Sequence, residues 1–379
     1  MNSDVLIIGA GVIGLCIARE LHKKGFRRIE IVERGKAGQE ASFAAAGMLA
    51  PNAETDKIDD FYHFCSESNG LYPGFAAELL EETGIDIELD RSGTLFLAFS
   101  EKDAAVLRNR FNWQRDAGLR VEHLTAAETL GLEPFISTDV CESLFFADDW
   151  QVENRKLLAA LLKYTQLNGI EIQEHTEIQR ICLEDGKITG AESASNKFLA
   201  DLTILATGAW TSLIKLGEAA MPIIVKPIRG QMIGFHPHER LFQRVIYSPR
   251  GYIVPRADGR ILTGATVEDA GFDKSVTEDG VGKLREAALE IAPCLGDFEI
   301  SDRWTGLRPF AAEGLPILGE IPNAGNLFVA TAHYRNGILL APLTAKIIAA
   351  RIAEGKVSEY LKIFHPQRFR GVEQLSQLL

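Results

Sequence analysis

Three glycines near the amino terminus have the spacing of a phosphate-binding turn. Gly9, Gly11 and Gly14 form the pattern G-x-G-x-x-G in "GAGVIG", and Glu33 follows in "VERG". Such glycines let the backbone approach a pyrophosphate at a helix N-terminus, while the acid accepts hydrogen bonds from a ribose diol. The acid also disfavours a 2′-phosphate, so NADP is not expected. The residues predict a dinucleotide site and leave NAD and FAD open, although a glycine-rich turn in any doubly wound sheet would look similar.

A second candidate group is a single arginine among small and apolar residues. Arg308 lies in "TGLRP", and "FAAEGLPILG" follows it. A guanidinium in such surroundings needs an anion, and its planar fork matches a carboxylate through two parallel hydrogen bonds. From position alone, that carboxylate could belong to a substrate or to an internal Asp or Glu.

Buried strands and one helix are predicted to position these groups. "VLIIG" and "IEIVERG" are strand-like, and "LCIARELHKKG" has helical periodicity and ends at Gly25. Two later segments would bring backbone close to a flat ligand: residues 40–51, "EASFAAAGMLAP", and residues 198–210, "FLADLTILATGAW". Ser42 in the first could bond phosphate or ribose. These segments favour FAD, although residues 40–51 also suit a small-residue helix packed on the sheet.

The composition limits the classes of partner. The chain has 379 residues, of which 46% are hydrophobic and 24% charged, enough for two domains with a sizeable pocket. The net charge of -12 argues against nucleic acid or anionic membranes as partners. Five cysteines without a Cys-x-x-Cys pair predict reduced thiols and no metal site. With no signal peptide or membrane span in sight, we expect a cytoplasmic protein, which we also expect to form a homo-oligomer.

The order of motifs resembles a known family over essentially the whole chain. "GAGVIG", "ERG", "SFAAAGMLAP", "ILATGAW", "YIVPR", "GLRP" with "GLPILG", and "HYRNGILLAP" are similar to motifs of FAD-dependent amine oxidoreductases of the D-amino-acid oxidase superfamily. The segments "AAGML", "YIVPR" and "HYRNGILLAP" most resemble the bacterial glycine oxidases of thiamine biosynthesis. D-amino-acid dehydrogenases share "GLRP" and are the close alternative.

The resemblance implies a fold of α/β plus α+β class, of D-amino-acid oxidase or glutathione-reductase-2 type. A Rossmann-like FAD-binding domain would carry an inserted antiparallel-sheet substrate domain. The expected FAD-binding domain comprises residues 1–85, 145–220 and 300–379, and the substrate-binding domain residues 86–144 and 221–299. Strand-like segments support the second sheet at residues 93–100, 229–236, 252–256 and 260–266. Residues 101–118 and 280–294 are predicted to form amphipathic helices over it.

The resemblance also implies the substrate-binding residues. The arginine of this motif clamps the substrate carboxylate in the family, which assigns that role to Arg308. The tyrosine that matches Tyr252 contacts the same carboxylate, and Arg335 would lie at the substrate site. Taken alone, Tyr252 is better interpreted as a half-buried strand tyrosine. Tyr247 is a weaker candidate for the entrance, and Val267 stands where the family varies an apolar residue near the substrate.

The cofactor site is expected to draw on several segments. In the family, the segment from His333 to Leu339 wraps the isoalloxazine ring; backbone donors at the start of a helix there would stabilise negative charge, although a surface turn is the alternative. No cysteine stands near the arginine motif, so noncovalent FAD is predicted. The cofactor-binding residues are Gly9, Gly11, Val12, Ile13, Gly14, Glu33, Arg34, Ala41, Ser42, Ala46, Gly47, Met48, Ile178, Thr207, Gly208, His333, Tyr334, Asn336, Gly337, Ile338 and Leu339.

The implied activity is oxidative deamination of glycine and other small amines, such as sarcosine and small D-amino acids. The products would be the oxoacid, ammonia or an amine, and hydrogen peroxide, and the imine would supply thiamine thiazole synthesis. No catalytic acid or base is predicted, because hydride transfer to flavin from a neutral amine needs none. The alternatives are a dehydrogenase that passes electrons to a quinone or carrier, and a catalytically silent FAD-binding protein.

Overall fold

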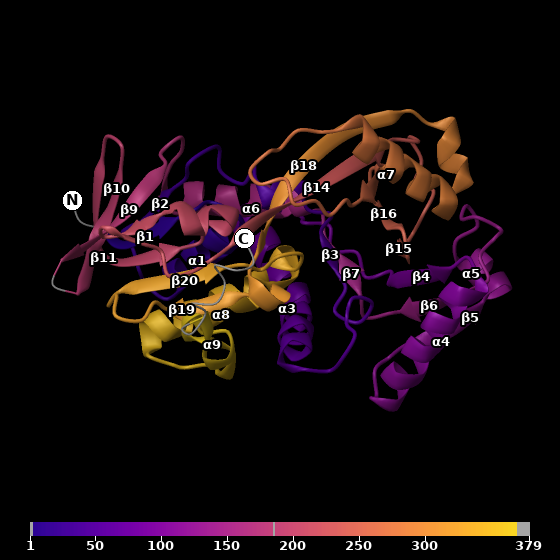
Figure 1. Cartoon of the computed structure of the whole chain (residues 1–379), viewed down its shortest axis with the longest axis horizontal. Coiled ribbons are helices and arrows are strands. Elements are labelled where there is room, and N and C mark those ends of the chain that lie inside the picture. The colour runs from indigo at the N-terminus through magenta and orange to yellow at the C-terminus, as the bar shows by residue number, and fades with distance from the viewer. Residues whose placement is uncertain (1–2, 185, 370–379) are drawn as a thin grey trace.

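The computed structural model describes residues 3–184 and 186–369, and its ribbon contains two large sheets side by side (Figure 1). The ends of the predicted nucleotide domain, residues 1–2 and 370–379, lie outside the described residues. The chain begins with β1 (Ser3–Ile8), α1 (Val12–Lys23) and β2 (Ile29–Val32). This confirms the predicted strand, turn, helix and strand around the glycines.

The first sheet is parallel where it holds the nucleotide-binding turn. β1 lies between β2 and β11 (Lys197–Leu205), and β8 (Glu171–Gln173) and β20 (Leu327–Thr331) extend the parallel set on either side. The start of β11 pairs antiparallel with β10 instead. The remaining strands of this ten-stranded sheet are β9 (Ile178–Glu184), β10 (Lys187–Ser193), β12 (Lys215–Leu216), β13 (Ala219–Ala220) and β19 (Ile317–Glu320).

Helices bury the apolar face of this sheet. α1 packs against α8 (Gly337–Glu354) and α6 (Asn154–Leu167), and α3 (Asp60–Thr83) packs against α8. The fully buried Leu15, Leu161 and Leu340 show how their apolar stripes meet in one core. Shorter elements are α2 (Ala41–Ala44) and α9 (Glu359–Ile363), the two-stranded pair β3 (Met48–Leu49) and β7 (Trp150–Gln151), and 3₁₀ turns at Gly208–Leu213, Pro293–Asp297, Ala312–Gly314 and Pro366–Phe369.

The second sheet has eight strands and is mostly antiparallel, as the sequence predicts. Its order is β18, β14, β17, β16, β15, β4, β6 and β5, with one parallel pair between β15 and β4. The strands are β4 (Thr94–Ala98), β5 (Glu122–Thr125), β6 (Glu142–Phe146), β14 (Lys226–Phe235), β15 (Val245–Ser248), β16 (Gly251–Pro255), β17 (Ile261–Gly264) and β18 (Ile300–Phe310). The helices α4 (Glu101–Asp116), α5 (Ala126–Leu132) and α7 (Glu278–Ile291) pack on it. The two sheets confirm the predicted fold class.

The domain boundaries themselves stay a prediction. β18 pairs with β14 along almost its whole length, from Ile300 to Phe310, so it belongs to the eight-stranded sheet. The predicted division instead starts the last nucleotide-binding segment at residue 300. In Figure 1, β14 and β18 run together from the second sheet toward the first, where the two halves meet.

Candidate flavin and substrate site

A large cavity is lined by residues from both sheets. Its volume is about 990 Å³, at the upper end of the range of about 300–1,000 Å³ for cofactor and ligand sites. Gly9, Glu33 and Thr207 line it from the nucleotide-binding sheet, and Tyr252 and Arg308 line it from the eight-stranded sheet. A ligand in this cavity would therefore contact both halves of the molecule.

The predicted glycine turn packs so closely against neighbouring backbone that side chains would not fit. Gly9 has a φ of +106°, and a Cβ there would lie 2.4 Å from the carbonyl oxygen of Ala206. A Cβ on Gly14 would lie 2.0 Å from the carbonyl oxygen of Gly9. Gly14 does not line the cavity: it lets α1 pack close to the turn.

The N-terminus of α1 borders the cavity, and a residue distant in sequence accepts one of its N–H groups. Its N-cap, Gly11, has no side chain to bond the first-turn N–H groups. The Ser42 hydroxyl oxygen accepts one of them, from Val12, at 3.0 Å. The hydroxyl hydrogen remains available to a phosphate, together with the positive end of the helix dipole.

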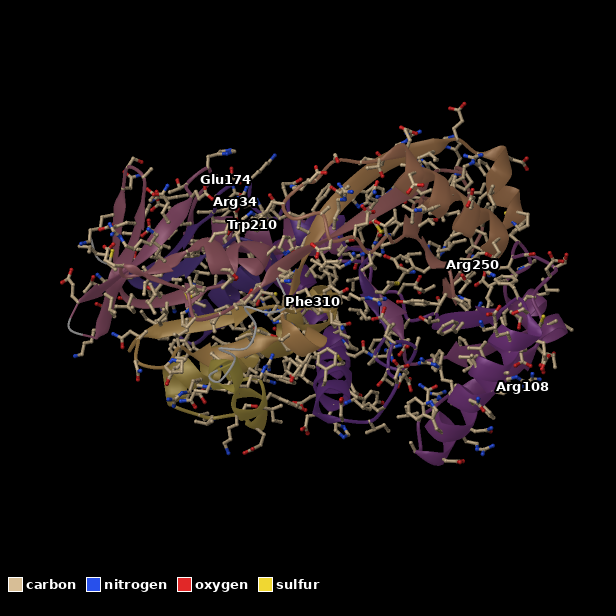
Figure 2. All side chains as sticks on the ribbon, in the orientation of Figure 1. Arg34, Arg108, Glu174, Trp210, Arg250 and Phe310 are labelled. Atoms are coloured by element: carbon tan, nitrogen blue, oxygen red, sulfur yellow. The ribbon has the colours of Figure 1, made fainter. Side chains whose placement is uncertain are left out.

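Glu33 is placed to bind a ribose at the end of β2. Its side chain is buried and accepts the backbone N–H groups of Ala10 and Gly35 at 2.8 and 2.9 Å. Each oxygen retains a second lone pair for a ligand hydroxyl. The neighbouring Arg34 guanidinium lies 4.3 Å from the ring centre of Trp210, which also lines the cavity (Figure 2).

The small-residue run at residues 40–51 both lines the cavity and packs as a short helix. A Cβ on Gly306 of β18 would lie 2.5 Å from the Cβ of Ala44, so α2 sits directly on this strand. Gly47 has a φ of +72°, and a Cβ there would meet the carbonyl oxygen of Val152 at 2.1 Å. Residues 40–51 therefore contribute to the ligand cavity and also contain a small-residue helix packed on a strand, so both interpretations of the sequence apply.

The segment from residue 330 to 342 enters the cavity and is not a surface turn. His333 is 3% exposed, and its Nε2 lies 3.1 Å from the hydroxyl of Thr344. Burial lowers the pKa of His333 to about 3, so the ring is neutral at physiological pH. Asn336 caps α8 without a side-chain hydrogen bond, so the first-turn N–H groups of α8 lack such an acceptor beside the cavity.

The buried His333 should make folding less favourable in acid. Its pKa lies below the ordinary value of 6.5, so below that pH His333 is protonated in the unfolded chain but stays neutral in the folded chain. Stability then falls by about 1.4 kcal/mol per pH unit as the pH drops below 6.5, and is unaffected above it. In His333→Gln, whose amide can still bond Thr344, we expect the loss of unfolding free energy between pH 7 and pH 5 to shrink by about 2 kcal/mol. Denaturant titrations at both pH values measure this, with the exposed His63→Gln as control; an unchanged loss in His333→Gln would contradict the assignment.

Arg308 extends from β18 into the cavity without a carboxylate partner. Among residues 3–184 and 186–369, no Asp or Glu forms an ion pair with it, and its Nη1 donates to the carbonyl oxygen of Thr266 at 3.0 Å. A Cβ on Gly230, in the adjacent β14, would lie 2.2 Å from that Nη1, so this glycine makes room for the guanidinium. The internal-partner alternative for Arg308 therefore finds no support in the described residues.

Tyr252 lines the cavity beside Arg308. It is buried, and its hydroxyl donates to the sulfur of Met232 at 3.3 Å. Burial raises the pKa of Tyr252, and the positive charges of Arg308 and Arg335 oppose this rise. The tyrosine is thus both a buried strand residue and a residue of the cavity wall, next to both cations.

Arg335 and Tyr247 share a partner that the sequence did not reveal. Arg335 Nη2 donates to Glu54 Oε1 at 3.1 Å, and the Tyr247 hydroxyl donates to the same oxygen. Glu54 follows the small-residue run in "PNAETDK", where no motif or periodicity marks it.

Val267 lines the cavity and is 64% exposed.

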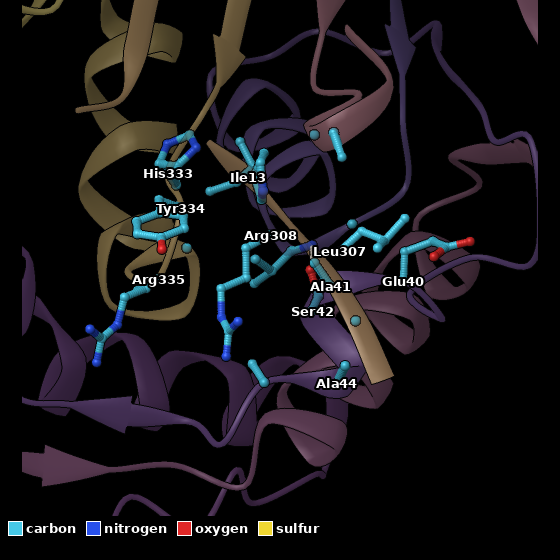
Figure 3. A pocket seen from close by; sticks show the side chains of 18 of the residues that line it. Ile13, Glu40, Ala41, Ser42, Ala44, Leu307, Arg308, His333, Tyr334 and Arg335 are labelled. Atoms are coloured by element: carbon cyan, nitrogen blue, oxygen red, sulfur yellow. Dashed lines mark hydrogen bonds between the residues drawn. The ribbon is translucent and has the colours of Figure 1, made fainter. Parts of the chain in front are cut away.

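The cavity brings together nearly all the predicted site residues. Gly14 and Leu339 are the predicted residues that do not line it; Leu339 belongs to α8 and is buried in the core. Figure 3 shows Arg308 and Arg335 extending in the same direction, with Tyr334 and His333 next to them and Ser42 on the other side. The predicted residues that line the cavity are Gly9, Gly11, Val12, Ile13, Glu33, Arg34, Ala41, Ser42, Ala46, Gly47, Met48, Ile178, Thr207, Gly208, Tyr252, Arg308, His333, Tyr334, Arg335, Asn336, Gly337 and Ile338.

Other features of the described residues bear on the chemistry. No three His, Cys, Asp or Glu side chains gather there as metal ligands would, and no helix there is long and apolar enough to cross a membrane. The five cysteines are all free and none lines the cavity. The glycine cradle, the helix N-termini and Glu33 together fit the pyrophosphate and ribose of FAD.

Comparison with known proteins agrees with this geometry. The family model described as "FAD dependent oxidoreductase" (DAO) matches residues 4–351. A glycine oxidase of Geobacillus kaustophilus is 36% identical over 371 residues, with 97% of each chain covered. A crystal structure of glycine oxidase from Geobacillus kaustophilus superposes with a TM-score of 0.90 at 34% identity, covering 97% of this chain and 99% of that one.

A further relative is longer than this chain. The bifunctional protein ThiO/ThiG of Synechocystis sp. is 37% identical over 375 residues, which are 97% of this chain and 54% of that protein. The chain thus spans about half the length of that relative. The resemblance noted in the motifs is confirmed: the chain belongs to the family of FAD-dependent oxidoreductases of D-amino-acid oxidase type and, within it, to the glycine oxidase type.

Proposed function

We propose that this chain oxidatively deaminates glycine and other small amines, including sarcosine and small D-amino acids, with oxygen as electron acceptor. The products are the oxoacid, ammonia or an amine, and hydrogen peroxide, and the intermediate imine can supply thiamine thiazole synthesis. The observation that carries the proposal is Arg308, a cation without a carboxylate partner among the described residues, in the cavity that also holds the glycine turn.

The residues of the cavity would bind and orient the substrate. Arg308 holds its carboxylate through two parallel hydrogen bonds, and the Tyr252 hydroxyl adds a donor beside it. The buried, apolar side chain of Met232 lines the same cavity and would exclude water from the bound substrate. Bound FAD supplies the two-electron chemistry by accepting a hydride from the α-carbon and passing the electrons to oxygen.

The cofactor is proposed to bind noncovalently. None of the free cysteines lines the cavity, so no thiol there can bond to the flavin. Gly9, Ser42 and Glu33 would hold the pyrophosphate and ribose, and the start of α8 would face the ring. A cytoplasmic location and a homo-oligomer stay predictions from the sequence.

The proposal is tested with a panel of amines in air. Glycine, sarcosine, D-alanine and L-alanine are each given to the purified protein, and peroxide, ammonia or methylamine, and oxoacid are measured. We expect equimolar peroxide and glyoxylate from glycine and no turnover of L-alanine. Turnover without peroxide, dependent on an added quinone, would contradict an oxidase.

Tyr252→Phe should weaken substrate binding modestly. The substitution removes one donor beside Arg308 and retains the ring, so we expect KM for glycine to rise about fivefold to tenfold while kcat changes little. Steady-state peroxide release measures this. Tyr360→Phe, which removes an exposed hydroxyl bonded to Glu67 at 2.8 Å, is the matched control. Equal KM values for Tyr252→Phe and the parent chain would exclude Tyr252 from carboxylate binding.

A further inference from the structure

Two arginines reach the substrate end of the cavity, but only one is available to an anion. Arg308 has no carboxylate partner among the described residues, whereas Arg335 is ion-paired with Glu54 at 3.1 Å. Figure 3 shows both guanidinium groups pointing the same way from neighbouring segments. The three groups together carry one net positive charge, which matches a substrate with a single carboxylate.

Glu54 is fixed in place by several segments of chain. Its Oε1 accepts from Arg335, just before α8, and from Tyr247 on β15. The positive charge of Arg335 and the buried Tyr247 hydroxyl are therefore both satisfied by one carboxylate. Glu54 raises the pKa of Arg335, and burial together with the negative charge of Glu54 raises the pKa of Tyr247.

The loop that carries Glu54 is anchored on both sides of it. The fully buried Asp149 accepts the N–H of Asn52 at 3.0 Å and the N–H of Ala53 at 2.7 Å. Arg110 donates to the carbonyl oxygens of Ala53 and Thr55 at 2.9 and 2.6 Å. A loop held this way presents Glu54 at a defined position rather than as a freely moving surface charge.

We propose that Glu54 is a specificity-determining residue, which neutralises Arg335 and restricts the site to amines that bear one carboxylate. The inference rests on the proposed function and adds the class of substrate that the site rejects. That class is secondary amines with two carboxylates. Their second carboxylate would need to pair with Arg335, which is already paired with Glu54. Removing the charge of Glu54 should therefore admit it.

Iminodiacetate is the simplest probe of this class. Its oxidation breaks one methylene C–H and the N–H bond as C=N forms, and two electrons pass by way of FAD to oxygen, which becomes hydrogen peroxide. Water then hydrolyses the imine to glyoxylate and glycine. Because glycine is itself a substrate, the rate is taken from the first, anaerobic reduction of the flavin.

The test compares the second-order rate constant of anaerobic flavin reduction by iminodiacetate with that by glycine in Glu54→Gln. Glutamine can still accept from the Tyr247 hydroxyl but no longer neutralises Arg335, so we expect the ratio to rise at least about tenfold. Glu278→Gln is the matched control: it removes a carboxylate that pairs with Arg303 at 3.0 Å and does not line the cavity. Its ratio should equal that of the parent chain. Glu54→Gln combined with Arg335→Gln should lose the gain.

Binding gives a second readout that needs no turnover. By calorimetry, the parent holoprotein should bind malonate no more tightly than acetate, and Glu54→Gln should bind malonate at least about tenfold more tightly than the parent. Parent protein that already prefers malonate tenfold would overturn the inference. So would an unchanged iminodiacetate ratio in Glu54→Gln, or an equal rise in Glu278→Gln. Parent protein that no amine reduces would instead reject the proposed function, and malonate binding would still decide the role of Glu54.

Discussion

Replacing Arg308 with alanine should lower kcat/KM for glycine by about a thousandfold, the fold-change that corresponds to about 4 kcal/mol. The loss should appear chiefly as a higher KM, because the guanidinium binds the carboxylate both before and during the reaction. Within the part of the chain that the structure describes, the guanidinium donates to the carbonyl oxygen of Thr266 and pairs with no carboxylate, so the fold should persist without it. Peroxide release against glycine concentration measures the effect, and flavin absorbance reports retained FAD.

The same strand offers a matched control for this substitution. Arg303 also lies on β18, but it is exposed and pairs with Glu278 at 3.0 Å. Arg303→Ala should leave KM for glycine within a factor of two of the parent. If Arg308→Ala behaved like Arg303→Ala, the carboxylate clamp would have to be sought elsewhere in the cavity.

Gly14→Ala should destabilise the nucleotide-binding half by about 3 kcal/mol or more and abolish FAD binding. The added methyl group would lie 2.0 Å from the carbonyl oxygen of Gly9, and backbone cannot swing aside as a side chain can. Helix α1 would have to move away from the turn and from the pyrophosphate site. Urea unfolding and the flavin content of the purified protein measure both consequences.

Gly70→Ala is the control for the glycine prediction. Gly70 lies inside the helix α3, is exposed, and a Cβ there would meet nothing within 4 Å. Alanine favours a helix over glycine, so this variant should be stabilised by up to about 1 kcal/mol. Equal stability of Gly14→Ala and Gly70→Ala would show that the close contact of residue 14 with the carbonyl oxygen of Gly9 does not require a glycine.

The nucleotide-binding part was predictable because its signals are local. The glycine turn, α1 and Glu33 lie within one continuous strand, helix and strand, where spacing alone fixes the geometry. Four strands of the second sheet, β4, β14, β16 and β17, were likewise visible from their composition and turns, whereas β5, β6, β15 and β18 were not predicted as parts of it. The close approach of Gly9 to Ala206 explains why only glycine serves there, although Ala206 is remote in sequence.

The charge balance at the substrate end could not be predicted, because its partners are distant in sequence. Glu54 accepts from Tyr247, 193 residues later, and from Arg335, 281 residues later. The room for Arg308 comes from Gly230 on another strand, which reads in sequence as an ordinary strand glycine. Such pairings follow from the packing of the two sheets, not from any local pattern.

The most direct test of the central claim is a single anaerobic mixing of the yellow holoprotein with glycine, followed by air. The account predicts that the flavin absorbance bleaches, with glyoxylate formed in equal amount, and that air restores the colour and produces peroxide. Flavin that stays oxidised with glycine, sarcosine and D-alanine, although FAD is bound, would contradict the account and favour a silent FAD-binding protein.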